Sequence, residues 1–223
     1  MSVSPVEFIR IAEESGLIVP LGNYVLDEAC RQLAYWRRAI PGGESLQMSV
    51  NLSPRQMRAS DIVDVVAETL DRHRLPGDAL WLEITESVMM EDSLTTVAVM
   101  TGLRTLGVRL AVDDFGTGYS SLSHLARLPV DKVKIDREFV ALLGEDGHAI
   151  AVAQTVVALA RSLGLGTVAE GIETSAQAAL ALELEFDLGQ GFLYQRPVTP
   201  ERVIDLLAVE GRIVPEGDER LPQ

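Results

Sequence analysis

The chain carries the sequence VRLAVDDFGTG at residues 108–118, an apolar run that ends in two adjacent acids and a glycine-containing turn. The apolar run predicts a strand over Val108–Asp113, and the glycines that follow permit a tight turn. The adjacent carboxylates of Asp113 and Asp114 repel one another unless a cation lies between them or one of them holds a proton. A pair of Mg²⁺ or Mn²⁺ ions bridged by one carboxylate fits this pattern, because both ions prefer oxygen ligands. The alternative is an Asx turn that caps the next helix.

The same order, an apolar run followed by a polar group, recurs along the chain. Segments long enough for a helix separate the runs, and a repeated strand–helix order predicts a parallel sheet. In a closed α/β barrel, the C-terminal ends of the strands meet at one mouth, where the chemistry takes place. We therefore expect an α/β fold, a TIM-like barrel that is incomplete because about six of the eight strands are present. The other strands are expected at Gln47–Leu52, Leu80–Thr85, Lys132–Ile135, Thr167–Glu170 and Phe186–Gln190.

Two strand ends in the first half of the chain carry candidate metal ligands. Glu83 alternates with apolar neighbours, so it points to the opposite face of the sheet, which in a barrel is the interior. The alternative is that Glu83 pairs with an arginine at the barrel rim. Glu86 adds a second acid, and Asn51 supplies an amide oxygen, which is a suitable ligand for Mg²⁺. At Asn51 the alternative is structural, with Ser53 capping the following turn.

The strand ends in the second half add a cation and further polar groups. Lys134 lies inside an apolar strand, where a lysine is costly unless acids pair with it. It could hold a phosphate or orient a water molecule, and the alternative is a buried ion pair with Asp136 or Glu170. Glu170 is placed to act as a general base or as a ligand of a second metal. Gln190 could hydrogen-bond a ligand oxygen or a guanine edge, with a structural role as the alternative.

Helix signals fill the gaps between the strands. Ser4 and Glu7 form a capping-box pattern, with Pro5 at the first helical position. The apolar face expected for the helix over Ser93–Leu106 begins at Leu94. Further helices are expected over Asn23–Arg38, Asp61–His73 and His148–Leu163, after a capping box at Thr174 and Gln177, and from Thr199 to about Ala208.

Bulk composition fits one globular domain. The chain has 223 residues, of which 47% are hydrophobic and 23% charged. Because the composition does not change abruptly within residues 1–209, we expect one domain over this range, followed by a polar tail over 210–223. The net charge of −14 excludes binding of DNA or RNA polymers through a basic surface. Cys30 is the only cysteine, which excludes an internal disulfide. We find neither a signal peptide nor a membrane segment in the sequence, and we expect a cytoplasmic protein.

Short ordered motifs run through nearly the whole chain, from Ser4 to about Leu207. They are Ser4-Pro5, Asn51-Leu52-Ser53, Glu83-Ile84-Thr85-Glu86, Asp113 to Ser121, Lys134-Ile135-Asp136, Ala169 to Glu173 and Gln190-Gly191-Phe192. Together they resemble the EAL family of bacterial cyclic-di-GMP phosphodiesterases. The resemblance implies a modified TIM barrel that hydrolyses cyclic-di-GMP to linear pGpG with Mg²⁺ or Mn²⁺.

The resemblance also implies roles for the residues at the strand ends. Asn51, Glu83 and Asp113 look like ligands of a first metal, and Asp113 would bridge to a second metal held with Asp114 and Glu170. Two of the residues would be catalytic, Lys134 at the attacking water or the scissile phosphate, and Glu170. The residues expected to support the site or the bound nucleotide are Glu86, which would hold the loop over Asp114–Tyr119, Asp136, Glu173 and Gln190.

One feature of the family is missing from the sequence. The Glu-Ala-Leu triplet, whose glutamate is a ligand of the first metal, occurs nowhere in the chain. We therefore expect a chain shortened at its N-terminus, lacking its first strands and impaired in activity. The alternatives are an inactive EAL-like module that binds cyclic-di-GMP or a protein partner, and another metal-dependent barrel enzyme. A homodimer and an upstream sensory or GGDEF-type domain are the other partners that the resemblance suggests.

Overall fold

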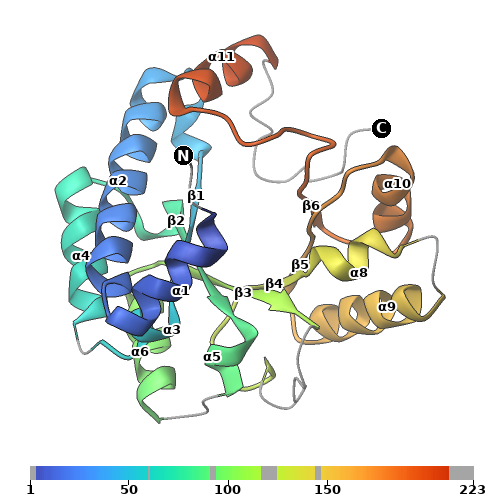
Figure 1. Cartoon of the computed structure of the whole chain (residues 1–223). Coiled ribbons are helices and arrows are strands. Elements are labelled where there is room, and N and C mark those ends of the chain that lie inside the picture. Colours follow the sequence, from blue (N-terminus) through green and yellow to red (C-terminus); the bar gives the residue numbers. More distant parts are fainter. Residues whose placement is uncertain (1–3, 60, 91–93, 117–124, 144–146, 211–223) are drawn as a thin grey trace. The chain divides into compact units, whose positions relative to one another are not determined.

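The computed structural model describes residues 4–59, 61–90, 94–116, 125–143 and 147–210 (Figure 1). Contacts between Cα atoms divide the chain into two compact units, Met1–Arg109 and Leu110–Gln223. Within the described ranges, no helix is both long enough and apolar enough to cross a membrane.

The first unit combines helices with two parallel strands. The strands pair from Met48 opposite Leu80 to Asn51 opposite Glu83. In chain order the elements are α1 (Pro5–Ser15), α2 (Ile18–Ala39), β1 (Met48–Asn51), α3 (Pro54–Met57), α4 (Ile62–His73), β2 (Leu80–Thr85), α5 (Glu86–Met90) and α6 (Leu94–Thr105), with 3₁₀ turns at Gly43–Ser45 and Gly77–Ala79.

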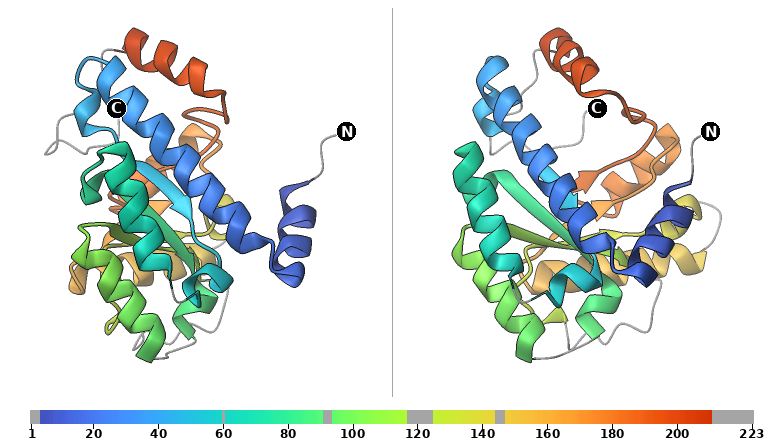
Figure 2. Two further views of the ribbon diagram at one scale, coloured as in Figure 1. Left: turned by 90° about the vertical axis from the view of Figure 1, so that its left-hand side faces the viewer. Right: turned by 60° about the vertical axis from the view of Figure 1, so that its left-hand side comes forward.

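The core of the first unit lies between its helices and its strands. Helix α2 packs against α4 and against β1 (Figure 2). Cys30 and Leu33 on α2, Val66 on α4, and Leu82 and Ile84 on β2 are fully buried. Removal of such apolar side chains from water is the main force that holds helices on a sheet. The packing brings the C-terminal ends of β1 and β2 together, with Asn51 and Glu83 side by side in the pairing.

The second unit carries four strands that pair in parallel, in the order of the chain. Helix α9 packs against β4, β5 and α8 (Figure 1), and it buries Ala149, Ala153, Val157 and Ala160 at helical spacing. The elements are β3 (Arg109–Phe115), β4 (Lys132–Ile135), α8 (Arg137–Ala141), α9 (Gly147–Ser162), β5 (Gly166–Ala169), α10 (Ser175–Glu183), β6 (Leu188–Gly189) and α11 (Pro200–Glu210).

The predicted strands are confirmed, two of them to the residue. The strands at Leu80–Thr85 and Lys132–Ile135 have the predicted bounds, and the others differ by a few residues at their ends. Helix α2 begins at Ile18, five residues before the predicted start. Pro20 lies in its first turn, where the missing N–H has no partner to lose.

Two predicted local details are wrong. Ser4 is the N-cap of α1, but its side chain makes no capping hydrogen bond, so the predicted capping box is not formed. Leu94, expected on the apolar face of α6, is 92% exposed because the buried face of that helix is made by Thr96, Met100 and Leu103. The capping box at Thr174 and Gln177 is present. The single domain over residues 1–209 stays a prediction, and the tail over 211–223 lies outside the described residues.

Candidate metal and phosphate site

Strand β3 ends in an irregularity that brings its two acids together. Val112 pairs with Val133 and Phe115 pairs with Ile135, so two residues of β3, Asp113 and Asp114, lie opposite one residue of β4. Asp114 has a φ of 55°, in the left-handed region that few side chains adopt. In a regular strand, adjacent side chains point to opposite faces, whereas a bulge redirects one of them. The bulge thereby allows both acids to contribute to one site.

Three carboxylates from two strand ends form a cluster. One oxygen each of Asp113, Asp114 and Glu170 lies within 4.8 Å of the other two. Glu170 directly follows β5, and its backbone N–H donates a hydrogen bond of 3.1 Å to the carbonyl of Ile135 at the end of β4. This position holds the Glu170 side chain beside the end of β4. The spacing of the three oxygens is short enough for one cation to bind them together.

Lys134 supplies a positive charge to this cluster. Its Nζ lies 2.9 Å from Oδ1 of Asp113 and 2.6 Å from Oε1 of Glu170, and its side chain is 7% exposed. A buried lysine stays charged only where carboxylates pair with it. The ion pair with Glu170, which was the structural alternative for Lys134, is therefore present, and a contact of Lys134 with phosphate or water stays a prediction. Asp136 caps α8, because its side chain accepts a hydrogen bond from the backbone N–H of Glu138 at 2.7 Å.

Three carboxylates and one lysine ammonium meet in this cluster. Oδ1 of Asp113 is buried and accepts no hydrogen bond within the described ranges, since the nearby ammonium of Lys134 does not meet it in hydrogen-bonding geometry. A buried acceptor without a donor is destabilising. Burial, followed by the charge of Asp113, raises the pKa of Asp114 to about 6. A divalent cation with oxygen ligands would relieve both conditions, so these residues fit such an ion.

The predicted residues of the first unit lie at adjacent strand ends. Asn51 is exposed at the end of β1, opposite the buried Glu83 of β2, and the buried Glu86 begins α5. Ser53 caps α3 in a capping box with Gln56, which confirms the structural alternative for that serine. The proposed roles of Asn51, Glu83 and Glu86 stay predictions. Half of the loop that Glu86 was expected to hold, residues 117–119, lies outside the described residues.

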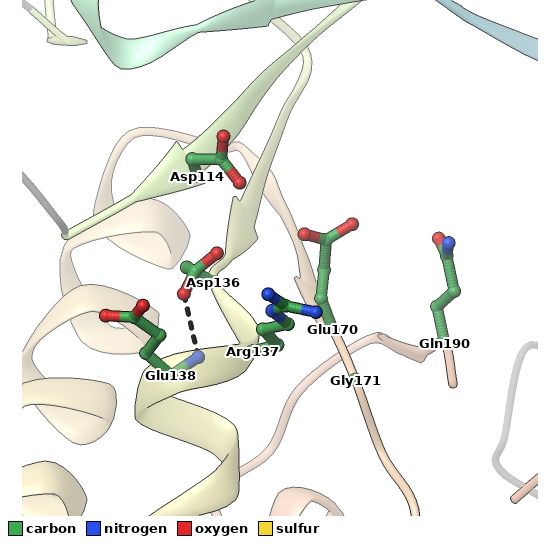
Figure 3. Close-up of a pocket in the computed structure, with 7 residues that line it drawn as sticks. All are labelled: Asp114, Asp136, Arg137, Glu138, Glu170, Gly171 and Gln190. Atoms are coloured by element: carbon green, nitrogen blue, oxygen red, sulfur yellow. Dashed lines mark hydrogen bonds between the residues drawn. The ribbon is translucent and has the colours of Figure 1, made fainter. Parts of the chain in front are cut away.

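A cavity of about 510 Å³ opens at the C-terminal ends of the strands of the second unit (Figure 3). Its lining includes four residues that the sequence analysis predicted, so these are brought together. Glu173 is not one of them: it is exposed, and its backbone N–H donates to Oε1 of Gln177. The residues lining the cavity are Asp114, Asp136, Glu170 and Gln190, which were predicted, and Arg137, Glu138 and Gly171, which were not.

The sequence did contain a signal for the residues that were missed. Arg137 and Glu138 follow Asp136, and they begin α8 just after the end of β4. The predicted site residues were carboxylates, amides and a lysine at the ends of strands, whereas Arg137 and Glu138 lie in the first turn of the next helix. Residues in the first turn after a strand end are therefore also candidates for such a site.

Comparison with known proteins places the chain in a family. MucR of Pseudomonas aeruginosa, a bifunctional diguanylate cyclase and cyclic di-GMP phosphodiesterase, is 42% identical over 207 residues, which make up 92% of this chain and 30% of MucR. NbdA of the same species, a cyclic di-GMP phosphodiesterase, is 40% identical over 196 residues, or 88% of this chain and 25% of NbdA. The chain thus spans less than a third of either relative.

The fold of this chain is similar to that of a solved structure. The c-di-GMP complex of the PaMucR phosphodiesterase is 43% identical, with a TM-score of 0.86 over 90% of this chain and 81% of that one. The predicted fold class, a TIM-like α/β barrel of the EAL type with six parallel strands in the described residues, is therefore confirmed. The EAL domain family matches residues 1–197, and the chain belongs to that family.

Proposed function

We propose that this chain is a metal-dependent phosphodiesterase domain that hydrolyses cyclic-di-GMP to linear pGpG. Family membership and the activities named for MucR and NbdA support this proposal. The observation that carries it is the cluster of Asp113, Asp114 and Glu170 around a buried lysine, with one buried carboxylate oxygen that lacks a hydrogen-bond donor among the described residues.

The proposed cofactor is Mg²⁺ or Mn²⁺, held by oxygen ligands. Asp113, Asp114 and Glu170 are the proposed ligands of one metal ion in the second unit. The sequence motifs add Asn51 and Glu83 as ligands of another metal ion, which they call the first, and Asp113 would bind both ions. When bound, such ions neutralise the attacked phosphodiester and make water a better nucleophile.

The side chains of the site would divide the remaining tasks. Lys134 holds the carboxylates of Asp113 and Glu170 in place through its two ion pairs, which fixes the ligand geometry before substrate arrives. Glu170 would accept the proton of the attacking water as a general base. Asp136 and Gln190 line the cavity and would contact the nucleotide. Supporting roles for Glu86 and Glu173 remain predictions from the sequence.

Product formation tests the proposed activity. The purified chain is incubated with cyclic-di-GMP and Mn²⁺, and pGpG is measured by chromatography. We expect pGpG from the unaltered chain and at least about a hundredfold less from Glu170→Gln, because this change removes a proton acceptor. Glu185→Gln is a matched control, since Glu185 is an exposed carboxylate of the same unit that pairs with Arg161 outside the cavity; it should retain full activity.

Two other results would overturn the proposal in different ways. Tight calorimetric binding of cyclic-di-GMP without pGpG, with either Mn²⁺ or Mg²⁺, would identify an inactive binding module. No binding at all would point to another metal-dependent barrel enzyme. A homodimer, further domains such as a sensory or GGDEF-type domain, and a cytoplasmic location belong to the same proposal as predictions from the sequence.

A further inference from the structure

The cavity of the second unit has a strong imbalance of charge. Four carboxylates line it, those of Asp114, Asp136, Glu138 and Glu170, and Arg137 is the one cation in the lining among the described residues (Figure 3). The proposed substrate carries two phosphodiester groups and hence two negative charges. A site of this composition repels such a ligand unless each phosphate meets a positive charge. Bound metal ions would meet the phosphate that is cleaved, which leaves the second phosphate to the protein.

Lys134 and Arg137, the two cations described above, differ in their availability to a ligand. Lys134 is buried, and the carboxylates of Asp113 and Glu170 already hold it. Arg137 is exposed, and it forms no ion pair within the described part of the chain. A guanidinium that is always charged and carries five N–H donors can bind two oxygens of one phosphate at once. Arg137 is therefore the side chain that is able to take a phosphate without breaking an existing pair.

The backbone around Arg137 is fixed by a close approach. Gly171, in the segment after β5, has a φ of 69°, and a Cβ at this position would lie 2.4 Å from Cβ of Arg137 and 3.2 Å from its Cα. No real Cβ tolerates the shorter of these distances, so only glycine allows the two segments to lie this close. The contact holds the first turn of α8 against the segment after Glu170. The base of the Arg137 side chain is thus set at a defined place in the cavity wall.

We propose that Arg137 binds the phosphate of the cyclic dinucleotide that is not cleaved, and so selects substrates that carry a second phosphate. This inference rests on the proposed function. A contact to a group that does not react is made equally in the bound substrate and in the transition state. Such a contact lowers KM and leaves kcat unchanged.

Steady-state kinetics of Arg137 variants test the inference. With cyclic-di-GMP and Mn²⁺, we expect Arg137→Ala to raise KM by about ten- to a hundredfold, as loss of a charged hydrogen bond does, with kcat within about threefold of the unaltered chain. The KM of Arg137→Lys should lie between those of the unaltered chain and of Arg137→Ala, because an ammonium keeps the charge but loses the bidentate geometry. Arg161→Ala, which removes an exposed arginine outside the cavity, should behave like the unaltered chain. Circular dichroism and the thermal midpoint establish that each variant is folded.

A probe with a single phosphate separates recognition of the second phosphate from a general structural effect. Bis(4-nitrophenyl) phosphate, used as a substrate or as a competing inhibitor, should be bound equally by Arg137→Ala and by the unaltered chain. An unchanged KM for cyclic-di-GMP, a loss confined to kcat, or equal losses for both ligands would each overturn the inference.

Failure of the proposed function gives a different pattern. If the unaltered chain binds cyclic-di-GMP without turnover, calorimetry replaces kinetics, and Arg137→Ala should weaken binding by the same factor. If the unaltered chain neither binds nor cleaves it, the proposed function fails and this inference fails with it.

Discussion

Lys134 is the residue on which the charge balance of the carboxylate cluster depends. Its ammonium lies within 2.9 Å of two carboxylates in a place where little water reaches it. Removal of one partner from a buried ion pair leaves the remaining charge uncompensated, and such changes are strongly destabilising. A bound divalent cation would supply positive charge at the same place.

We expect Lys134→Met to lower the free energy of unfolding of the metal-free chain by about 3–5 kcal/mol. Addition of Mg²⁺ or Mn²⁺ should recover part of the loss, because the ion compensates the carboxylates that Lys134 leaves behind. Urea denaturation at pH 7, in EDTA and in excess metal, measures both effects.

Lys132→Met is the matched control for this prediction. Lys132 is half-buried on the same strand, whereas the ion pairs with Asp113 and Glu170 described above are those of Lys134. Replacement of Lys132 should lower the free energy of unfolding by less than replacement of Lys134, and added metal should not recover this loss. Equal losses in the two variants, with equal responses to metal, would show that the cluster does not depend on Lys134.

The sequence predicted the chemical groups of this site better than their arrangement. Asp113, Asp114, Lys134 and Glu170 were predicted because carboxylates and a lysine after apolar runs are unusual. The bulge that brings both aspartates to one side was not predicted, because it depends on pairing with β4 and not on the local sequence. The contact between Gly171 and Arg137 joins two segments distant in the chain, and periodicity carries no information about such a contact.

The bounds of helices and strands were predicted best where the sequence marked both ends of the element. Strand β2 is largely apolar, strand β4 alternates two lysines with Val133 and Ile135, and the bounds of both were predicted to the residue. The start of α2 was not: it lies five residues before the predicted Asn23, and Pro20 fits within its first turn. The exposure of Leu94 follows from its place at the start of α6, before the helix meets its neighbours.

Helices α2 and α4 are joined by a charged contact in the first unit. Oδ1 of Asp27 on α2 accepts hydrogen bonds from Nη1 of Arg72 at 2.6 Å and from Nε2 of His73 at 3.0 Å, both at the end of α4. The hydrogen bond from His73, and then that from Arg72, hold the pKa of Asp27 below its ordinary value, against the opposing effect of burial. A carboxylate whose pKa is lowered by folding stabilises the folded state above its unfolded pKa, and this contribution is lost as the pH falls through the folded value.

We expect Asp27→Asn to lower the free energy of unfolding at pH 7 by at most about 1 kcal/mol, because the contact is partly exposed to water. The difference from the unaltered chain should shrink below pH 4, where the carboxyl of the unaltered chain takes up a proton. Urea denaturation of both proteins at pH 7 and at pH 3 measures this difference in the free energy of unfolding. Glu28→Gln is the control, since Glu28 pairs with Arg31 on the same helix and does not join α2 to α4. A difference for Asp27→Asn that is the same at both pH values would contradict this account.

At the scale of the whole chain, a net charge of −14 has to be reconciled with an anionic substrate. Long-range repulsion alone would lower the affinity for a dinucleotide, so the proposed site depends on local positive charge. The charge of Lys134 is already paired with the carboxylates of Asp113 and Glu170. Arg137 adds a single positive charge to a cavity lined by four carboxylates. The proposed divalent cations would add positive charge at this place, so we expect metal binding to favour both uptake of the proposed substrate and stability of the cluster.

We therefore expect Mg²⁺ or Mn²⁺ to stabilise the EDTA-treated chain and to restore hydrolysis together. A ligand that binds only the folded state adds about 2.7 kcal/mol at a hundred times its Kd, which for a chain of this size raises the thermal midpoint by roughly 5–10 °C. Differential scanning calorimetry and the pGpG assay on the same samples measure the two effects. Asp113→Asn should lose both, because this residue supplies the buried oxygen that lacks a donor among the described residues. An equal shift from NaCl at matched ionic strength, or an unchanged shift in Asp113→Asn, would mean that the ions screen surface charge instead of binding at this cluster.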